Sequence, residues 1–276
     1  MTDQRLTPSN GRVAANHLQG KVKADQYVAG DLNQTKLSIT PLWRSADGQH
    51  KQRELLYGDG FTVLEKQGGF SFGQCEKDGY VGYVECSSLQ ESTPTTHFIS
   101  NRGTHIYQSP DIKSTVLMPL SFGSRLESLG KSGEFLEIAS GGFVPASHTR
   151  AAKDTFGDPV EVAELFLGTP YLWGGNSCWG IDCSGLVQVA LLTCGFKSPG
   201  DSDMQEASVG AVLGNNSKIE RGDLLFWEGH VAMAVDENIM IHANAHHMSV
   251  THEPIDLAVE RIFNSGGGNL TSRRRP

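Results

Sequence analysis

The sequence predicts an α+β protein in which two small all-β units precede a domain of helices and antiparallel sheet. From about residue 26 to residue 150, short apolar stretches are separated by Gly and Asp, which is typical of strands joined by turns. After about residue 152 the composition shifts toward helix formers, and short stretches with strand character return from residue 223 onward. These two observations carry the predicted fold class.

The composition is that of an ordinary globular protein, with 38% of its 276 residues hydrophobic and 20% charged. No run approaches the ~18 consecutive apolar residues that a transmembrane helix needs. The formal net charge of −8 argues against a nucleic-acid partner, because phosphate binding requires a basic face. We therefore expect a soluble protein of two or three modules, with neither a membrane nor a nucleic-acid partner.

The first 25 residues are polar, and we expect them to form an N-terminal arm, residues 1–25. They contain no apolar stretch of the kind that a secretory signal peptide requires, so we expect a cytoplasmic protein. An odd number of cysteines argues against a disulfide framework and fits a reducing compartment. The five cysteines are Cys75, Cys86, Cys178, Cys183 and Cys194.

Two all-β units are expected next, over residues 26–90 and 97–150, joined by a polar linker that begins at Ser87. In the first unit we expect strands at Lys36–Thr40, Gly60–Glu65, Gly69–Gly73 and Gly79–Glu85. Parts of the first unit recur about 65 residues later in the same order. The closing strand Tyr80–Val84, for example, is matched by Gly141–Val144, each with a Gly-aromatic-Val sequence. This pattern resembles tandem bacterial SH3-like barrels.

The mixed domain is expected over residues 152–265. Asp158 and Pro159 read as the cap and first position of a helix that ends at Gly168, and a second helix should end at Gly195. Strands are expected at Asp223–Trp227, Gly229–Val235, Ile239–Ala243 and Met248–Glu253. Residues 266–276, with three consecutive arginines after three glycines, are expected to form a flexible basic tail.

Cys183 is the first candidate for chemistry. It follows Asp182, which can cap the second helix, so the thiol should lie in the first turn, where free N–H groups and the helix dipole favour a thiolate. Gly174, Gly175 and Gly185 would let a substrate backbone approach closely. The alternative is that Cys183 is a small buried apolar residue, as we expect for Cys194 on the apolar stripe of the same helix.

A thiol nucleophile needs a base, and that base needs an orienting group. If residues 236–238 form a three-residue hairpin loop, His230 and His242 lie on one face of two paired strands, close enough for their side chains to bond. A two-residue loop would place His242 on the opposite face. A histidine on a strand is also often only a satisfied structural residue, so spacing alone does not decide the question.

Five motifs in this region resemble the NlpC-type cysteine peptidases of bacterial peptidoglycan. In chain order they are Gly168–Gly175 (GTPYLWGG), Ile181–Val187 (IDCSGLV), Arg221–Trp227 (RGDLLFW), Gly229–Ala232 (GHVA) and Ile241–Ala243 (IHA). The resemblance implies a papain-like catalytic domain without a cofactor or a catalytic metal. It further implies that Cys183 is the nucleophile, His230 the general base and then acid, and His242 the residue that orients His230. Tyr171 matches a tyrosine that helps to stabilise the oxyanion.

Members of the family cleave the amide between the γ-carboxyl of D-glutamate and a diamino acid. Tandem SH3-like barrels before the catalytic domain resemble the cytoplasmic γ-D-glutamyl-L-diamino acid endopeptidases of dipeptidyl-peptidase VI type. The implied substrate is a small muropeptide, L-Ala-γ-D-Glu-diaminopimelate or its lysine counterpart, with a free N-terminus, and the implied product is L-Ala-D-Glu.

The resemblance also implies a pocket for the free ammonium, closed by the first barrel so that it selects short fragments. From the catalytic domain, the matching residues are Asp182, Ser184 and Ser202. From the first barrel they are Tyr80 and an acid that is either Glu54 or Asp59. Gly200 stands where the family often has Arg, and Asp182 can instead serve only as a helix cap.

Four other interpretations remain. A metal site is suggested by a histidine cluster that adds His246, His247 and His252 to His242, although a His-Glu-x-x-His helix is missing and we expect these three to form a polar edge. A related acyl-transfer reaction could use the same cysteine. An autolysin would cut polymeric peptidoglycan, and a muropeptide sensor would bind without cutting.

Overall fold

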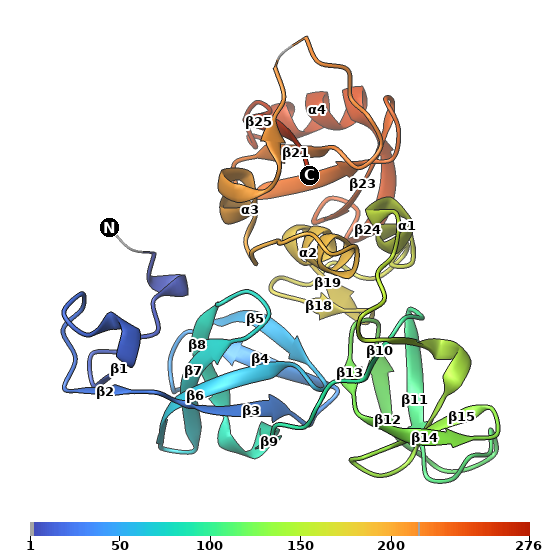
Figure 1. Cartoon of the computed structure of the whole chain (residues 1–276). Helices are drawn as coiled ribbons and strands as arrows, with labels where there is room; N and C mark the ends of the chain where they lie inside the picture. The colour runs from blue at the N-terminus through green and yellow to red at the C-terminus, as the bar shows by residue number, and fades with distance from the viewer. Residues whose placement is uncertain (1–2, 215) are drawn as a thin grey trace. The chain divides into compact units, whose positions relative to one another are not determined.

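The computed structural model describes residues 3–214 and 216–276, which separate into two compact units (Figure 1). The N-terminal unit is Met1–Lys153 and the C-terminal unit is Asp154–Pro276. Each unit is described by itself. Among the described residues, no helix has the length and apolar character to cross a membrane.

The N-terminal arm packs on the sheet that follows it. It contains the short 3-10 helices η1 (Gln4–Leu6) and η2 (Asn16–Leu18) and the strand β1 (Val13–Ala15), which pairs in parallel with β2 (Gln26–Val28) directly after the arm. Val13 and Ala15 are buried against Leu64 and Phe72. The arm is therefore part of the hydrophobic core of the N-terminal unit.

The first β-module is a seven-stranded antiparallel sheet in the order β5-β4-β8-β7-β6-β3-β9. Its strands are β3 (Asp31–Thr35), β4 (Ile39–Trp43), β5 (Lys51–Leu56), β6 (Gly60–Gln67), β7 (Phe70–Cys75), β8 (Val81–Glu85) and β9 (Leu89–Glu91), with η3 (Cys86–Ser88) between the last two. The strand expected at Lys36–Thr40 lies three residues later, as β4. β5 was not predicted, because its sequence KQRELL shows no apolar alternation.

The second β-module comprises a three-stranded sheet, β13-β10-β17, and a five-stranded sheet, β12-β11-β16-β15-β14. The strands are β10 (His97–Ile99), β11 (Gly103–Tyr107), β12 (Val116–Ser121), β13 (Arg125–Leu126), β14 (Ser128–Ser132), β15 (Phe135–Ile138), β16 (Phe143–Pro145) and β17 (Thr149–Ala151), with η4 (Ala146–His148) before the last. Its core contains Ile99, Leu120 and Val144, and it also contains Tyr57 from the first β-module.

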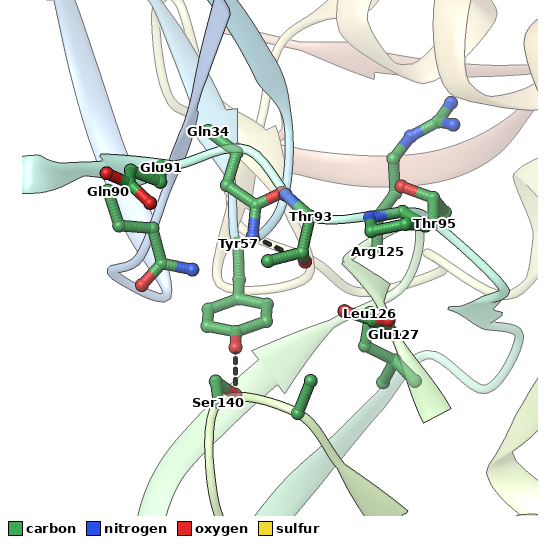
Figure 2. A pocket seen from close by; sticks show the side chains of 12 residues that line it. Gln34, Tyr57, Gln90, Glu91, Thr93, Thr95, Arg125, Leu126, Glu127 and Ser140 are labelled. Carbon is green, nitrogen blue, oxygen red and sulfur yellow. Dashed lines mark hydrogen bonds between the residues drawn. The ribbon is translucent and has the colours of Figure 1, made fainter. Parts of the chain in front are cut away.

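The two β-modules are joined through the segment around Tyr57. The backbone N–H of Arg125 donates to the carbonyl of Tyr57, and the Tyr57 hydroxyl bonds to Ser140. Figure 2 shows these groups lining a cavity of about 290 Å³, with Gln34 hydrogen-bonded to Thr93 on its wall. Of the side chains drawn there, Tyr57 bonds to Ser140 and so ties the first β-module to the second.

The C-terminal unit has a six-stranded sheet in the order β20-β25-β21-β22-β23-β24. The strands are β20 (Ala211–Val212), β21 (Leu224–Trp227), β22 (His230–Ala234), β23 (Ile239–Asn244), β24 (Ser249–Pro254) and β25 (Ser272–Arg275), and a small hairpin is formed by β18 (Asn176–Ser177) and β19 (Gly180–Ile181). The helices are α1 (Pro159–Glu164), α2 (Cys183–Thr193), α3 (Ser202–Ser208) and α4 (Ile255–Asn264).

The sheet lies between α4 and the pair formed by α1 and α2 (Figure 1). On the α4 side, Trp227, Ala232 and Met240 pack against Ala258 and Ile262 of the helix. On the other side, α2 packs on β22 and β23. The α+β class predicted from sequence is confirmed, and the four predicted strands after residue 222 correspond to β21 to β24.

The prediction of a flexible basic tail is wrong from Ser272 onward. This segment forms β25, which pairs with β20 and β21 inside the sheet. The Arg275 guanidinium donates to both carboxylate oxygens of the buried Asp223, at 2.8 and 2.9 Å. Without β25, the backbone groups along this edge of β21 would be unpaired and the buried carboxylate of Asp223 would have no cation. The tail pairs with β21 and places Arg275 beside Asp223. The first helix is also shorter than predicted, since α1 ends at Glu164.

Candidate active site

The start of α2 is held by one carboxylate. Asp182 is the N-cap, and its Oδ1 accepts hydrogen bonds from the Gly185 N–H at 2.6 Å and the Ser184 hydroxyl at 3.1 Å. Its Oδ2 accepts from the Gly174 N–H at 2.9 Å. Gly185 cannot carry a side chain, because a Cβ there would lie 2.7 Å from the Gly175 carbonyl. Asp182 therefore joins the Gly-rich loop to the helix turn that carries Cys183.

Cys183 is the first residue of α2, and its side chain is almost fully buried, with the residue 7% exposed. Backbone N–H groups of Ser184 and Val231 donate to the sulfur. Burial, with a smaller contribution from the charge of Asp182, still raises the pKa of the thiol to about 12. The expectation that the helix N-terminus ionises this thiol is therefore wrong for the resting protein, because desolvation outweighs the helix dipole and the N–H donors.

The side chains of His230 and His242 are in hydrogen-bond contact, as expected from a three-residue hairpin loop between their strands. The Val235 N–H donates to the Ile239 carbonyl, and the ladder pairs Met233 with Ile241. The Nε2 of His230 lies 2.9 Å from the Nδ1 of His242. Val231, whose N–H reaches the Cys183 sulfur, directly follows His230. The start of β22, the strand that begins with His230, thus lies against the start of α2.

Burial keeps both imidazoles neutral. It lowers the pKa of His230 to about 3 and that of His242 to about 4. The resting site consequently holds a neutral thiol and a neutral base. Such a pair can react only if the thiol proton moves to the imidazole as the sulfur attacks, which is general-base catalysis.

Two further residues, neither predicted from sequence, extend the row of hydrogen-bonded side chains that starts with His230 and His242. The Nε2 of His242 lies 3.0 Å from Oε2 of Glu253 on β24. Arg261 on α4 donates to both oxygens of that carboxylate, at 2.8 and 2.7 Å. A sequence signal existed, because Glu253 ends the strand predicted beside His242 and a buried acid needs a cation.

Tyr171 lies beside the nucleophile. Its backbone N–H donates to the Met248 carbonyl at 2.9 Å, and it forms a bridge with Ile181 in β19. Burial, followed by the charges of Cys183 and Asp182, raises the pKa of its phenol. Tyr171 therefore presents a neutral hydroxyl that can donate a hydrogen bond near the sulfur.

The segment before α3 is anchored next to Ser184. Gln205 of α3 is fully buried, and its amide donates to the carbonyls of Ser184 at 2.9 Å and Pro199 at 3.0 Å. Ser202, the first residue of α3, lies one turn before Gln205. The structure thus ties the turn that contains Ser202 to the residue that follows Cys183.

The other predicted binding residues belong to the N-terminal unit. Tyr80 is buried, with the guanidinium of Arg53 5.7 Å from its ring centre and its hydroxyl 3.4 Å from Gln52. Glu54 is buried and pairs with Lys51 at 2.8 Å. Asp59 is buried where the two β-modules meet and pairs with Lys77 at 2.9 Å.

One cluster has the composition of a metal site. The side-chain donor atoms of His242, His247 and Glu253 lie within 4.8 Å of one another. Both oxygens of Glu253 nevertheless accept hydrogen bonds from Arg261, whose positive charge opposes a cation. The arrangement is that of a hydrogen-bonded chain of side chains. Of the other two clustered histidines, His246 contacts the His247 ring and His252 pairs with Glu164 at 3.3 Å.

A cysteine at the start of a helix that packs on an antiparallel sheet, with a bonded histidine pair on the two strands that contact this helix, is the arrangement of a papain-like cysteine peptidase. The chain belongs to the NlpC/P60 family. Residues 168–262 match the NlpC/P60 family, and residues 42–89 match the bacterial dipeptidyl-peptidase Sh3 domain.

Two relatives are similar across both units. The chain is 30% identical to dipeptidyl-peptidase 6 of Lysinibacillus sphaericus over 215 residues, which is 69% of this chain and 79% of that protein. It is 29% identical to the gamma-D-glutamyl-L-lysine dipeptidyl-peptidase of Bacillus subtilis (strain 168), over 70% of this chain and 72% of that protein.

A solved structure shares the fold over most of the chain. A crystal structure of an NlpC/P60 family protein from Bacillus cereus ATCC 10987 matches with a TM-score of 0.74 at 19% sequence identity. The match covers 89% of this chain and 99% of that one.

Proposed function

We propose that this peptidase hydrolyses the amide bond between the γ-carboxyl of D-glutamate and a diamino acid in short peptidoglycan peptides with a free N-terminus. The observations that carry the proposal are the bonded pair His230 and His242, and Cys183 at the start of α2, whose sulfur accepts from the N–H of Val231, the residue after His230. Relatives that match both units bear the names dipeptidyl-peptidase 6 and gamma-D-glutamyl-L-lysine dipeptidyl-peptidase, which support this substrate class.

In the proposed mechanism, His230 takes the thiol proton while the sulfur of Cys183 attacks the γ-carbonyl carbon. The developing oxyanion is stabilised by the Tyr171 hydroxyl and by backbone N–H at the start of α2. Protonated His230 then gives its proton to the leaving amine of the diamino acid. Water, deprotonated by His230, hydrolyses the thioester and releases L-Ala-D-Glu with the thiol restored.

The free ammonium of the substrate is the basis of the proposed selectivity. An ammonium at a closed pocket end needs acceptors, because an unpaired buried charge is costly. We assign this role to Asp182, Ser184 and Ser202 in the C-terminal unit.

The direct test is incubation of the protein with L-Ala-γ-D-Glu-L-Lys and with the diaminopimelate counterpart, followed by mass spectrometry. We expect release of L-Ala-D-Glu, and its loss in Cys183→Ala. Cys194→Ala is the matched control, because this half-buried cysteine lies at the other end of the same helix. Cleavage that persists in Cys183→Ala would disprove the assignment of the nucleophile.

A second arm separates this activity from that of an autolysin. N-acetylation removes the ammonium, so the acetylated tripeptide should not be cleaved, and purified peptidoglycan sacculi should stay intact. Efficient cleavage of either one would instead indicate an enzyme that acts on polymer. Cytoplasmic recycling of cell-wall peptides is part of the same proposal, and cell fractionation with an antibody against the chain tests it.

A further inference from the structure

We propose that Glu253, held by Arg261, is a positioning residue that sets through His242 which ring nitrogen of His230 accepts the thiol proton. This inference rests on the proposed function, in which Cys183 and His230 carry out the hydrolysis. Glu253 does not touch the reacting atoms in this scheme. It acts on them only through the imidazole of His242.

The chain of contacts is continuous, and the part from His242 to Glu253 is shielded from water. It runs from Nε2 of His230 to Nδ1 of His242 at 2.9 Å, and from Nε2 of His242 to Glu253 at 3.0 Å. The His242 side chain is 0% exposed and that of Glu253 is 10% exposed. Water therefore cannot replace a missing partner of His242, and each hydrogen on this chain is assigned by the group next to it.

The direction of every hydrogen bond in this chain of contacts follows from the ionised carboxylate of Glu253. A carboxylate that accepts two bonds from a guanidinium is ionised and has no proton to give, so Nε2 of His242 must carry the hydrogen. A neutral imidazole has one N–H, which leaves Nδ1 of His242 as an acceptor. Nε2 of His230 must then be the donor, and Nδ1 of His230 carries no hydrogen.

This order of protons matters for the reaction. With Nε2 of His230 occupied by His242, only Nδ1 of His230 is left to accept a proton from a thiol. If the chain were reversed, Nδ1 would already carry hydrogen and His230 could not act as a base. A protease whose orienting aspartate is replaced by the amide loses most of its turnover for this reason, although its geometry is intact.

Arg261 has its own part in the arrangement. Burial of Glu253 without a cation would favour its protonated form, which could donate to His242 and admit the reversed order. The paired guanidinium holds the pKa of Glu253 below its usual value despite burial. Arg261 therefore keeps Glu253 an acceptor.

The first test is nitrogen-15 NMR of the histidine rings in the unmodified protein at neutral pH. Spectra of His230→Gln and His242→Gln assign the signals. We expect both rings to be neutral with the hydrogen on Nε2. A neutral His230 with its hydrogen on Nδ1 would overturn the proposal without any need for a variant of Glu253.

The second test is the steady-state kinetics of Glu253→Gln on L-Ala-γ-D-Glu-L-Lys, with Glu260→Gln as control. The amide can donate to His242, so we expect kcat to fall at least about tenfold, KM to change less than about twofold, and part of His230 to shift to the Nδ1–H form. Glu260 is exposed on the same helix as Arg261, so its variant should behave as the unmodified protein. Arg261→Lys should show a smaller loss of kcat.

The outcomes separate this inference from the proposed function. If Cys183→Ala retains cleavage, the proposed function fails. If Cys183→Ala is inactive but Glu253→Gln keeps its kcat and its ring hydrogens in correctly folded protein, only the present inference fails. In that case Glu253 serves as a structural tie between β24 and α4.

Discussion

Asp182 combines two tasks in one carboxylate, since Oδ1 caps α2 and Oδ2 holds the Gly-rich loop. We predict that Asp182→Ala lowers the free energy of unfolding by about 1–2 kcal/mol, as loss of a helix cap does. We also predict a loss of turnover beyond the loss of folded protein, because the loop before the nucleophile is released. Urea denaturation and the peptide assay measure the two effects.

Asp158→Ala provides the comparison for this prediction. Asp158 caps α1 through the Val160 N–H at 2.8 Å and takes no part in the proposed site. Its variant should lose comparable stability and keep the turnover of the folded fraction. If both variants retain turnover, Asp182 is a helix cap and no more.

At the scale of single residues, the sequence predicted what local spacing determines. The Asp-Cys-Ser-Gly setting placed Cys183 at a helix start, and the loop length placed His242 beside His230. The roles of Glu253 and Arg261 were not predicted, because the contact between these two residues depends on how β24 and α4 pack together. The ionisation of Cys183 was predicted wrongly because burial belongs to the whole fold, and burial dominates the pKa of this thiol.

Among the elements, the β22-β23 hairpin carries the buried imidazole of His242 and the half-buried one of His230, both neutral, which makes stability depend on pH. Folded pKa values near 3 and 4 lie below the unfolded value of about 6.5, so the unfolded chain binds more protons below that pH. Stability is fully present above pH 6.5 and falls as pH drops toward 4. His242 alone should contribute a loss of about 2 kcal/mol between pH 6.5 and 5.

Denaturant titrations at several pH values between 4 and 8 measure this dependence. His242→Gln removes one titrating group, so its stability should fall less steeply below pH 6.5 than that of the unmodified protein. Identical slopes would show that His242 is not held neutral by the fold.

The same sheet contains a strand, β25, that the hydrophobic pattern of the sequence does not predict. β21 to β23 have mostly apolar sequences and were predicted, whereas β25 reads SRRR and looks like a solvated end. Its place is fixed by the open edge of β21 and by the buried Asp223, which are both distant in sequence. Strands without apolar alternation, such as β5 and β25, are set by their partners, and no local periodicity marks them.

For the molecule as a whole, the organisation into two all-β modules and a mixed domain was readable because glycine-rich turns and apolar alternation differ from helical periodicity along most of the chain. How the β-modules are joined was not readable. The first β-module contributes Tyr57 to the core of the second, so the two share hydrophobic burial within the N-terminal unit. A destabilising substitution at this junction should therefore lower the stability of both β-modules.

Gly58 offers the sharpest test of that coupling. It has a φ of +79°, and a Cβ at this position would lie 2.1 Å from the carbonyl oxygen of Arg125. Gly68 also has a positive φ, +60°, but nothing lies within 4 Å of its Cβ position. We predict that Gly68→Ala lowers the free energy of unfolding by about 1 kcal/mol from backbone strain alone. Gly58→Ala should lose at least about 2 kcal/mol more, because backbone must shift to relieve the overlap. Chemical denaturation of the full chain, followed by fluorescence and circular dichroism, measures both variants. Equal losses would mean that the Tyr57 segment and the second β-module adjust freely, and that the junction contributes little to the stability of the N-terminal unit.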